Sequence, residues 1–327
     1  MNTFDRLKIG IPHNCFGTVD ITNTSVHEIT HDGSTKVDEI YYQFRDLPDG
    51  VTDLRYHPSA GLVLDFSGKI LKERYPELVS IRNIDLALQN AIGHITEFDL
   101  ERVLEESSVY IAHVTKDIKV DGTVADEMAP LQYIHHPKFI QSRYESGLSF
   151  SSKNKKNRIR IKMYDKAKEM RRQYAFLKRY GKERILGAFE NTMRVELEIY
   201  HMSRFREVFQ SKETPMALID VLQCPLDIIA DFMDQMVLAM DSEELPDIPD
   251  GKIAEVEKEL GKRELIRYFD YDYSSIRYFI NSRNKGNNSP RLKTYRVLTG
   301  KLLTMRLRKN YSAEAVDRIT EIRKMFK

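Results

Sequence analysis

Cysteine is scarce in this sequence of 327 residues, which contains only Cys15 and Cys224. The two lie far apart and in none of the short spacings typical of metal sites. A disulfide framework needs several cysteines and an oxidising compartment. We therefore expect no disulfide scaffold, and a reducing cytoplasm as the location.

Long apolar runs are also absent. No stretch approaches the roughly 20 apolar residues that a transmembrane helix needs, and the segment from Met1 to Arg6 lacks the apolar core of a signal peptide. No repeat of solenoid length is present. These absences argue against a membrane protein and against a repeat array. The hydrophobic fraction of 41% supports a packed core, and the length suits two domains.

Net charge is low, at +2, but the charges are unevenly distributed. Lys153 to Lys182 holds thirteen Lys and Arg residues against Asp165 and Glu169. Tyr273 to Ala313 holds ten more and no acid. Two basic segments interleaved with aromatic residues indicate contact with nucleic acid. The alternative, solvated helix faces, explains one such segment more readily than two.

The pattern of apolar residues divides the chain near position 205. Before it, short alternating stretches predict strands, and four stretches predict helices, at 80–94, 98–105, 125–134 and 165–180. After it, the periodicity is helical only, with an acidic, proline-containing linker at 241–250. We expect an α+β body over 1–205, built on an antiparallel sheet with flanking helices, followed by an all-helical region over 206–327.

One stretch, Arg158 to Glu169, combines a strand pattern with chemistry. Its alternation places five polar side chains on one face, namely Arg158, Arg160, Lys162, Tyr164 and Lys166. A row of cations leading to a tyrosine hydroxyl suits a DNA strand laid along a sheet, with the tyrosine placed to attack a phosphate. Arg171 and Arg172 extend the basic segment into the following helix. The alternative is a solvated strand face whose tyrosine only packs.

Two other predicted strands offer metal ligands. His113 and Asp117 are four residues apart on the strand 109–120 and share a face. Glu196 and Glu198 share a face of the strand 190–200. If these strands are neighbours, His113, Asp117 and a glutamate can bind one Mn²⁺ or Mg²⁺ ion beside Tyr164.

Each candidate ligand also has a structural interpretation. His113 suits a packed core histidine, and Asp117 suits the start of a turn. A buried Glu196 needs a partner, and Arg194 or Lys166 would serve as well as a metal.

The C-terminal region contains a candidate duplex-binding element. A helix predicted at 274–281 is followed by a loop of Asn, Gly and Ser and a helix at 290–298. Such a pair is similar to a helix-turn-helix. Arg291, Lys293 and Arg296 would contact the DNA.

Taken together, these pieces resemble the gene II/X-type replication proteins of filamentous phages and the related plasmid rolling-circle initiators. The resemblance runs through the first two hundred residues. It rests on five short segments, Phe4–Pro12, Leu64–Leu71, Ile111–Ile118, Ile161–Lys166 and Met193–Glu198. The third usually reads Arg-x-Asp-x-Thr-x-Asp in the family, so the chain departs from it at Ile111 and His113.

The resemblance implies a sheet body of the replication-initiator nickase type and a metal-dependent enzyme that cuts and rejoins one strand at an origin. Tyr164 would form a 5′-phosphotyrosine link and leave a free 3′-OH for a polymerase. Asp117 and Glu196 carry over as metal-site acids, with His113 in place of the usual Asp and Lys166 near the phosphate.

Other functions remain open from the sequence. The same basic faces suit a non-catalytic DNA-binding replication or copy-number regulator, and the same sheet suits a plasmid mobilisation relaxase. Tyr144 and Tyr133 are the next candidates for the nucleophile. Expected partners are single-stranded and duplex origin DNA, with a host helicase, a polymerase or a second copy of the chain as further candidates.

Overall fold

The computed structural model describes residues 2–30, 37–129, 131, 139–154, 158–233, 253–283 and 290–299, and the single residues 302, 317 and 321. The chain forms two compact units. The first comprises Met1–Gln132, Lys138–Gln235 and Ile322–Lys327, and the second comprises Tyr133–Pro137 and Met236–Glu321. The predicted linker at 241–250 and Tyr133 lie outside the described residues.

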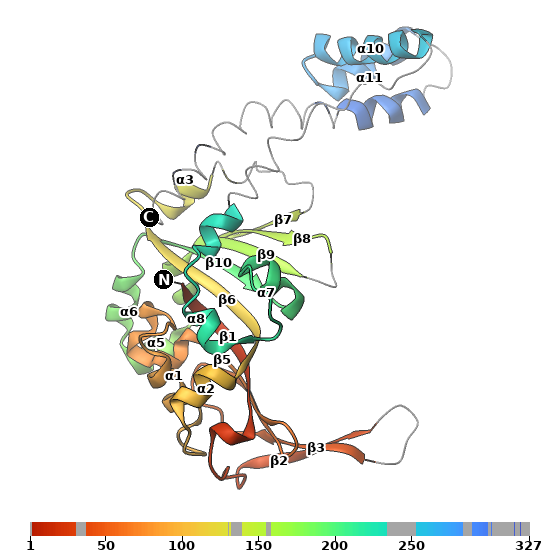
Figure 1. The fold of residues 1–327 in the computed structure, drawn as a ribbon. Coiled ribbons are helices and arrows are strands. Elements are labelled where there is room, and N and C mark those ends of the chain that lie inside the picture. The colour runs from red at the N-terminus through yellow and green to blue at the C-terminus, as the bar shows by residue number, and fades with distance from the viewer. Residues whose placement is uncertain are drawn as a thin grey trace. The chain divides into compact units, whose positions relative to one another are not determined.

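The first unit is built on one antiparallel sheet, which holds eleven strands among the described residues. Ten follow the order β2-β3-β4-β5-β1-β6-β10-β9-β8-β7, and β11 pairs with β6 (Figure 1). This confirms the predicted α+β class with an antiparallel sheet. The strands are β1 (Thr3–Ile11), β2 (Thr24–Thr30), β3 (Val37–Phe44), β4 (Val51–His57), β5 (Gly61–Ser67), β6 (Ser108–Lys119), β7 (Phe139–Tyr144), β8 (Gly147–Ser152), β9 (Ile159–Asp165), β10 (Thr192–Ile199) and β11 (Met216–Ala217).

Helices flank this sheet (Figure 1). The α-helices are α1 (Ile84–Ile92), α2 (Leu100–Glu106), α3 (Val124–Met128), α4 (Lys166–Met170), α5 (Tyr174–Tyr180), α6 (Lys182–Ala188), α7 (Met202–Val208) and α8 (Leu218–Leu222). Two 3₁₀ segments, η1 (His13–Cys15) and η2 (Gly68–Glu77), follow β1 and β5. Among the described residues, no helix is both long and apolar enough to cross a membrane.

Strand β10 explains how the two faces of the sheet differ. All eight of its residues are buried, although from Met193 onward they alternate between apolar and charged. Met193, Val195, Leu197 and Ile199 share one face, which belongs to the apolar core. Lys116, on the same face of β6, pairs with Asp227, so the segment after α8 covers this side. The opposite face carries Arg194, Glu196 and Glu198, and we call it the polar face.

The second unit is helical and has a small core of its own. Helices α10 (Ile253–Tyr268) and α11 (Tyr273–Arg283) are followed by helical residues 290–299. Ile266, Ile276, Ile280 and Tyr295 form the buried centre. Apolar residues thus recur at helical spacing in all three segments, which accounts for the helical prediction in this region.

Several local features differ from the sequence prediction, among them helix α6, which lies in a stretch where no helix was predicted. Strand β7 was not predicted. The helix predicted at 165–180 is broken into α4 and α5. The sequence pattern predicts two helices, at 252–259 and 263–268, but α10 is continuous through both. The two-residue strand β11 lies within a stretch expected to be only helical, because its backbone pairs with Val109 and Ser108 of β6.

Candidate active site

The register of three central strands assembles the polar face. In β10 and β6, Glu198 lies opposite His113, and Arg194 lies opposite Asp117. In β10 and β9, Arg194 lies opposite Tyr164. Directly opposed residues of an antiparallel pair point to the same side of the sheet. Side chains from widely separated parts of the chain therefore meet on one surface.

Three of these side chains form a group that suits a divalent cation. One ligand atom each from His113, Glu196 and Glu198 lies within 4.8 Å of the others, and all three residues are buried. His113 Nδ1 contacts Glu196 Oε1 at 3.1 Å. His113 Nε2 is buried and has no hydrogen-bond partner among the described residues. An imidazole beside two carboxylates is a donor set that fits Mn²⁺ or Mg²⁺.

Tyr164 adjoins this group. Its hydroxyl donates to Glu196 Oε2 at 3.4 Å. Burial, and then the negative charge of Glu196, raise the pKa of Tyr164 well above its usual value. At neutral pH the phenol is therefore protonated, and Glu196 is the carboxylate placed to take its proton.

Lys162 and Arg160 contact the same two carboxylates. The Lys162 ammonium contacts Glu198 Oε1 and lies 3.6 Å from Glu196 Oε2. Arg160 binds both oxygens of Glu198, with Nη2 to Oε1 at 2.8 Å. Tyr200 donates to Glu198 Oε2 at 2.6 Å. Burial alone would raise the pKa of Glu198, but Arg160 and Lys162 outweigh it and lower this pKa to about 2.

Next to Tyr164, Arg194 is the centre of a closed ionic network. Its side chain is fully buried. The guanidinium binds Asp117 through two bonds of 2.7 Å, and Nη1 donates to Asp5 Oδ1 and to the Tyr75 hydroxyl, each at 3.0 Å. Burial alone would raise the pKa of Asp5, but Arg194 and Lys166 lower it to about 2.

The structure thus brings together two of the three predicted metal ligands, His113 and Glu196. The carboxylate of Asp117 is bound by Arg194. Glu198 takes the third place in the group, because the register sets it, and not Asp117, next to the other two. The alternation of β10 signalled Glu198 in the sequence, since it shares a face with Glu196.

Lys166 is the first residue of helix α4, and its ammonium lies near the ring of Tyr164. Asp165 caps helix α4 by accepting from Lys168 N at 2.8 Å, so Lys166 begins the helix and does not continue the strand. Its ammonium is bound to Glu169 Oε2 at 2.6 Å and lies 5.6 Å from the centre of the Tyr164 ring. A direct contact between Lys166 and a phosphate stays a prediction.

The other predicted DNA-binding residues of the first unit are more exposed. Arg158 is exposed and its guanidinium lies 5.6 Å from the centre of the Tyr200 ring. Arg171 is exposed, and Arg172 pairs with Glu145 at 2.7 Å. The alternative nucleophile Tyr144 forms a 2.7 Å hydrogen bond with Ser149, on β8.

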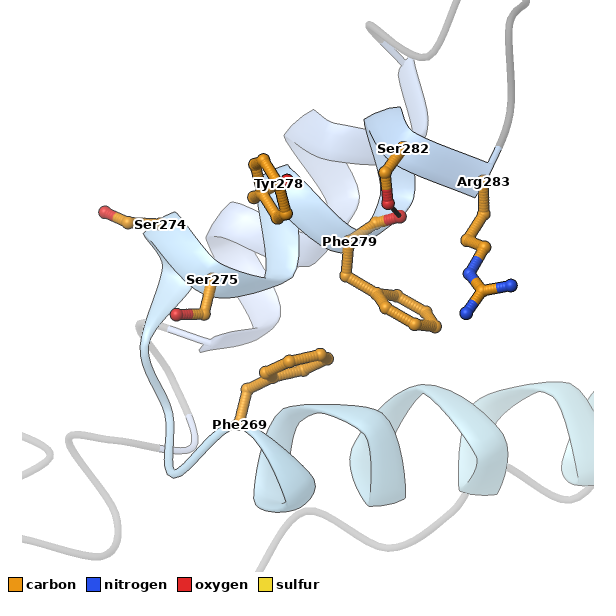
Figure 2. A pocket seen from close by; sticks show the side chains of 7 residues that line it. All are labelled: Phe269, Ser274, Ser275, Tyr278, Phe279, Ser282 and Arg283. Carbon is orange, nitrogen blue, oxygen red and sulfur yellow. Dashed lines mark hydrogen bonds between the residues drawn. The ribbon is translucent and has the colours of Figure 1, made fainter.

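In the second unit, the predicted duplex-binding residues Arg291, Lys293 and Arg296 are all exposed. A pocket between α10 and α11 is lined by Phe269, Ser274, Ser275, Tyr278, Phe279, Ser282 and Arg283 (Figure 2). The rings of Phe269 and Phe279 are 5.3 Å apart, and Arg283 lies 5.8 Å from the Phe279 ring. The pocket lining holds a cation and no acid, which agrees with the charge pattern of the sequence.

Comparison with known proteins gives a sparse result. No protein-family model matches the chain, and no curated protein matches its sequence. One similar solved structure is described as a rolling circle replication initiator protein from Geobacillus stearothermophilus. It has 11% sequence identity and a TM-score of 0.33, and the match covers 75% of this chain and 88% of that one. A likeness this distant defines neither fold nor function.

Proposed function

We propose that this protein initiates rolling-circle replication by nicking one strand of an origin through a phosphotyrosine intermediate and later rejoining it. The observation that carries the proposal is the position of the Tyr164 hydroxyl, 3.4 Å from Glu196 and next to the buried group of His113, Glu196 and Glu198. A nucleophile, a base and a set of metal ligands therefore adjoin one another on one face of a rigid sheet.

The chemistry balances with these residues. Tyr164 Oη attacks the phosphorus of the scissile phosphodiester and transfers its proton to Glu196. The bond from phosphorus to the 3′ oxygen breaks, which leaves a 5′-phosphotyrosine and, after protonation, a free 3′-OH. Rejoining reverses these steps. Lys166 and Arg194 help to orient Tyr164. The Lys166 ammonium lies over the Tyr164 ring, and Arg194 lies opposite Tyr164 in the β9–β10 pair.

A divalent cation would be held by His113, Glu196 and Glu198. When bound, it would supply Lewis acidity toward the phosphate oxygens and favour the ionised phenol. The protein contributes the burial of His113 and both carboxylates, which limits access of water to these ligands.

The decisive test uses a supercoiled plasmid with the cognate origin, incubated with Mn²⁺ or Mg²⁺. We expect nicking and a covalent protein–DNA adduct, both lost with EDTA and both lost in Tyr164→Phe. Tyr144→Phe is the matched control and should retain both. Nicking that persists unchanged in Tyr164→Phe would place the nucleophile elsewhere.

A non-catalytic DNA-binding regulator is the competing function. It predicts salt-sensitive DNA binding by the wild-type chain and no strand cleavage under any metal condition. The convergence of His113, Glu196 and Glu198 beside the Tyr164 hydroxyl favours the enzyme.

A further inference from the structure

The carboxylates proposed to bind a metal already have a cation between them. Lys162 contacts Glu198 Oε1 and lies 3.6 Å from Glu196 Oε2, so its ammonium bridges the two ligands. Arg160 binds Glu198 from the other side. The charges of the two carboxylates are balanced by those of Lys162 and Arg160. A divalent ion that entered the group would therefore create an excess of positive charge.

Arg160 and Lys162 differ in how readily they can leave. Arg160 is a planar fork that binds both oxygens of Glu198 and donates to Tyr200 at 3.1 Å. Lys162 is a point charge at the end of a flexible stem, and 27% of its side chain is exposed. Of these two described cations, only Lys162 contacts both Glu196 and Glu198. It is therefore the cation that a metal ion would displace.

The direction in which Lys162 would move follows from the strand. Lys162 and Tyr164 are two residues apart on β9 and point to the same side of the sheet, so their Cα atoms lie about 7 Å apart. An ammonium released from Glu196 and Glu198 stays tethered within reach of a phosphate at the Tyr164 hydroxyl.

We propose that Lys162 is a built-in competitor for the metal site, and that a divalent cation displaces its ammonium from Glu196 and Glu198 onto the phosphate of the bound DNA strand. Metal binding and DNA binding are then coupled through one side chain. The first half, displacement of Lys162 by the metal ion, depends only on the described contacts. The second half, contact of Lys162 with the DNA phosphate, rests on the proposed function.

Mn²⁺ titration of the full chain, followed by calorimetry, tests the exchange. Lys162→Met keeps the stem and removes the charge, and we expect it to bind Mn²⁺ at least tenfold more tightly than the wild type. Lys162→Arg keeps the charge and should gain no affinity. Lys116→Met, which loses one charge on the opposite face of the sheet, should bind Mn²⁺ as the wild type does. Equal or weaker binding by Lys162→Met would overturn the proposal.

A second readout guards against a folding defect. If Lys162→Met is destabilised by repulsion between Glu196 and Glu198, Mn²⁺ should raise its unfolding temperature by more than it raises that of the wild type. An equal or smaller rise would count against exchange in the same way.

The phosphate half is measured with a single-stranded oligonucleotide in the Tyr164→Phe background, which prevents cleavage. We expect Mn²⁺ to strengthen binding at least fivefold when Lys162 is present, and by a clearly smaller factor in the additional Lys162→Met variant, where only the metal itself contacts the phosphate. By linkage, the oligonucleotide should strengthen Mn²⁺ binding by the same factor. A gain of the same size without Lys162 would overturn the phosphate role. An absence of nicking by the wild type with an intact Mn²⁺ exchange would instead defeat only the proposed enzymatic function.

Discussion

The two ends of the polar face are built from the same kinds of residue but behave differently. At one end, the side chain of Arg194 is fully buried. Its guanidinium donates hydrogen bonds to Asp117, Asp5 and Tyr75. Around Glu196 and Glu198, the cations are partly exposed and His113 Nε2 has no partner among the described residues. We call these the closed end and the open end.

The difference shows how one sheet can separate support from chemistry. Desolvating a buried arginine and two carboxylates costs free energy, and removing one partner costs more because it leaves a buried charge unpaired. Such a group therefore holds its strands in register. A lysine that bridges two carboxylates from the edge of the solvent can be exchanged for another cation. Tyr164 lies between the ends, opposed by Arg194 and bonded to Glu196.

The largest effect is expected at the closed end. Arg194→Met should lower the free energy of unfolding by about 3–5 kcal/mol, because it leaves Asp117 and Asp5 without their partner. Urea unfolding measures this loss. Arg172→Met, which removes an exposed pair with Glu145, should change it by no more than about 0.5 kcal/mol. A loss below about 1 kcal/mol in Arg194→Met would remove the distinction between the ends.

Acid titration compares the two ends directly. The pKa of Glu198 is lowered from 4.5 to about 2, and that of Asp5 from 3.8 to about 2. A lowered pKa stabilises the folded chain above the unfolded-state value, and this contribution is lost as the pH falls toward 2. Each group should contribute on the order of 2–3 kcal/mol.

Unfolding free energies measured from pH 6 to pH 2 test this assignment. Glu198→Gln should flatten the acid limb between about pH 4.5 and 2 while the contribution of Asp5 remains. Asp5→Asn should do the converse. The exposed Glu145→Gln is the control and should leave the limb unchanged. A limb that neither variant alters would show that the acid sensitivity arises elsewhere.

A smaller effect is expected from Tyr200. Its hydroxyl donates to Glu198 and accepts from Arg160, so Tyr200→Phe should cost about 1 kcal/mol. The substitution removes contacts of the open end only, since Tyr200 bonds to Glu198 and Arg160. The affinity for Mn²⁺ should change by a smaller factor than in Lys162→Met. Tyr174→Phe, at an exposed position, is the control. A cost equal to that of Arg194→Met would mean that the open end is as rigid as the closed end.

The smallest effect on the site is expected from the second unit. Replacing Arg291, Lys293 and Arg296 with Ala should weaken binding of duplex origin DNA and reduce its salt dependence. Cleavage of a short single-stranded oligonucleotide should stay within about twofold of the wild type. Equal losses in the two assays would mean that these residues do not form a separate duplex-binding surface.

Much of the fold follows from local pattern. The alternation of Met193, Val195, Leu197 and Ile199 with three charged residues predicts a strand with two unlike faces, and β10 has them. Strand β7 was not predicted, because Phe139 to Tyr144 lacks that alternation. Most of this strand is exposed, including Ile140 and Tyr144. Gly261 weakens the helical pattern between the two predicted helices, yet the helix-forming residues on both sides continue α10 through it.

The sequence by itself determined which side chains share a face of the sheet. Side chains on a strand alternate with a period of two, so Arg160, Lys162 and Tyr164 had to lie together, as did Glu196 and Glu198. Only the tertiary structure decided which of them meet. Shifting two strands by two residues leaves every face unchanged but exchanges every partner. Spacing therefore predicted Asp117 and Glu196 as the acids beside His113, whereas the register gave Asp117 to Arg194 and set Glu198 opposite His113.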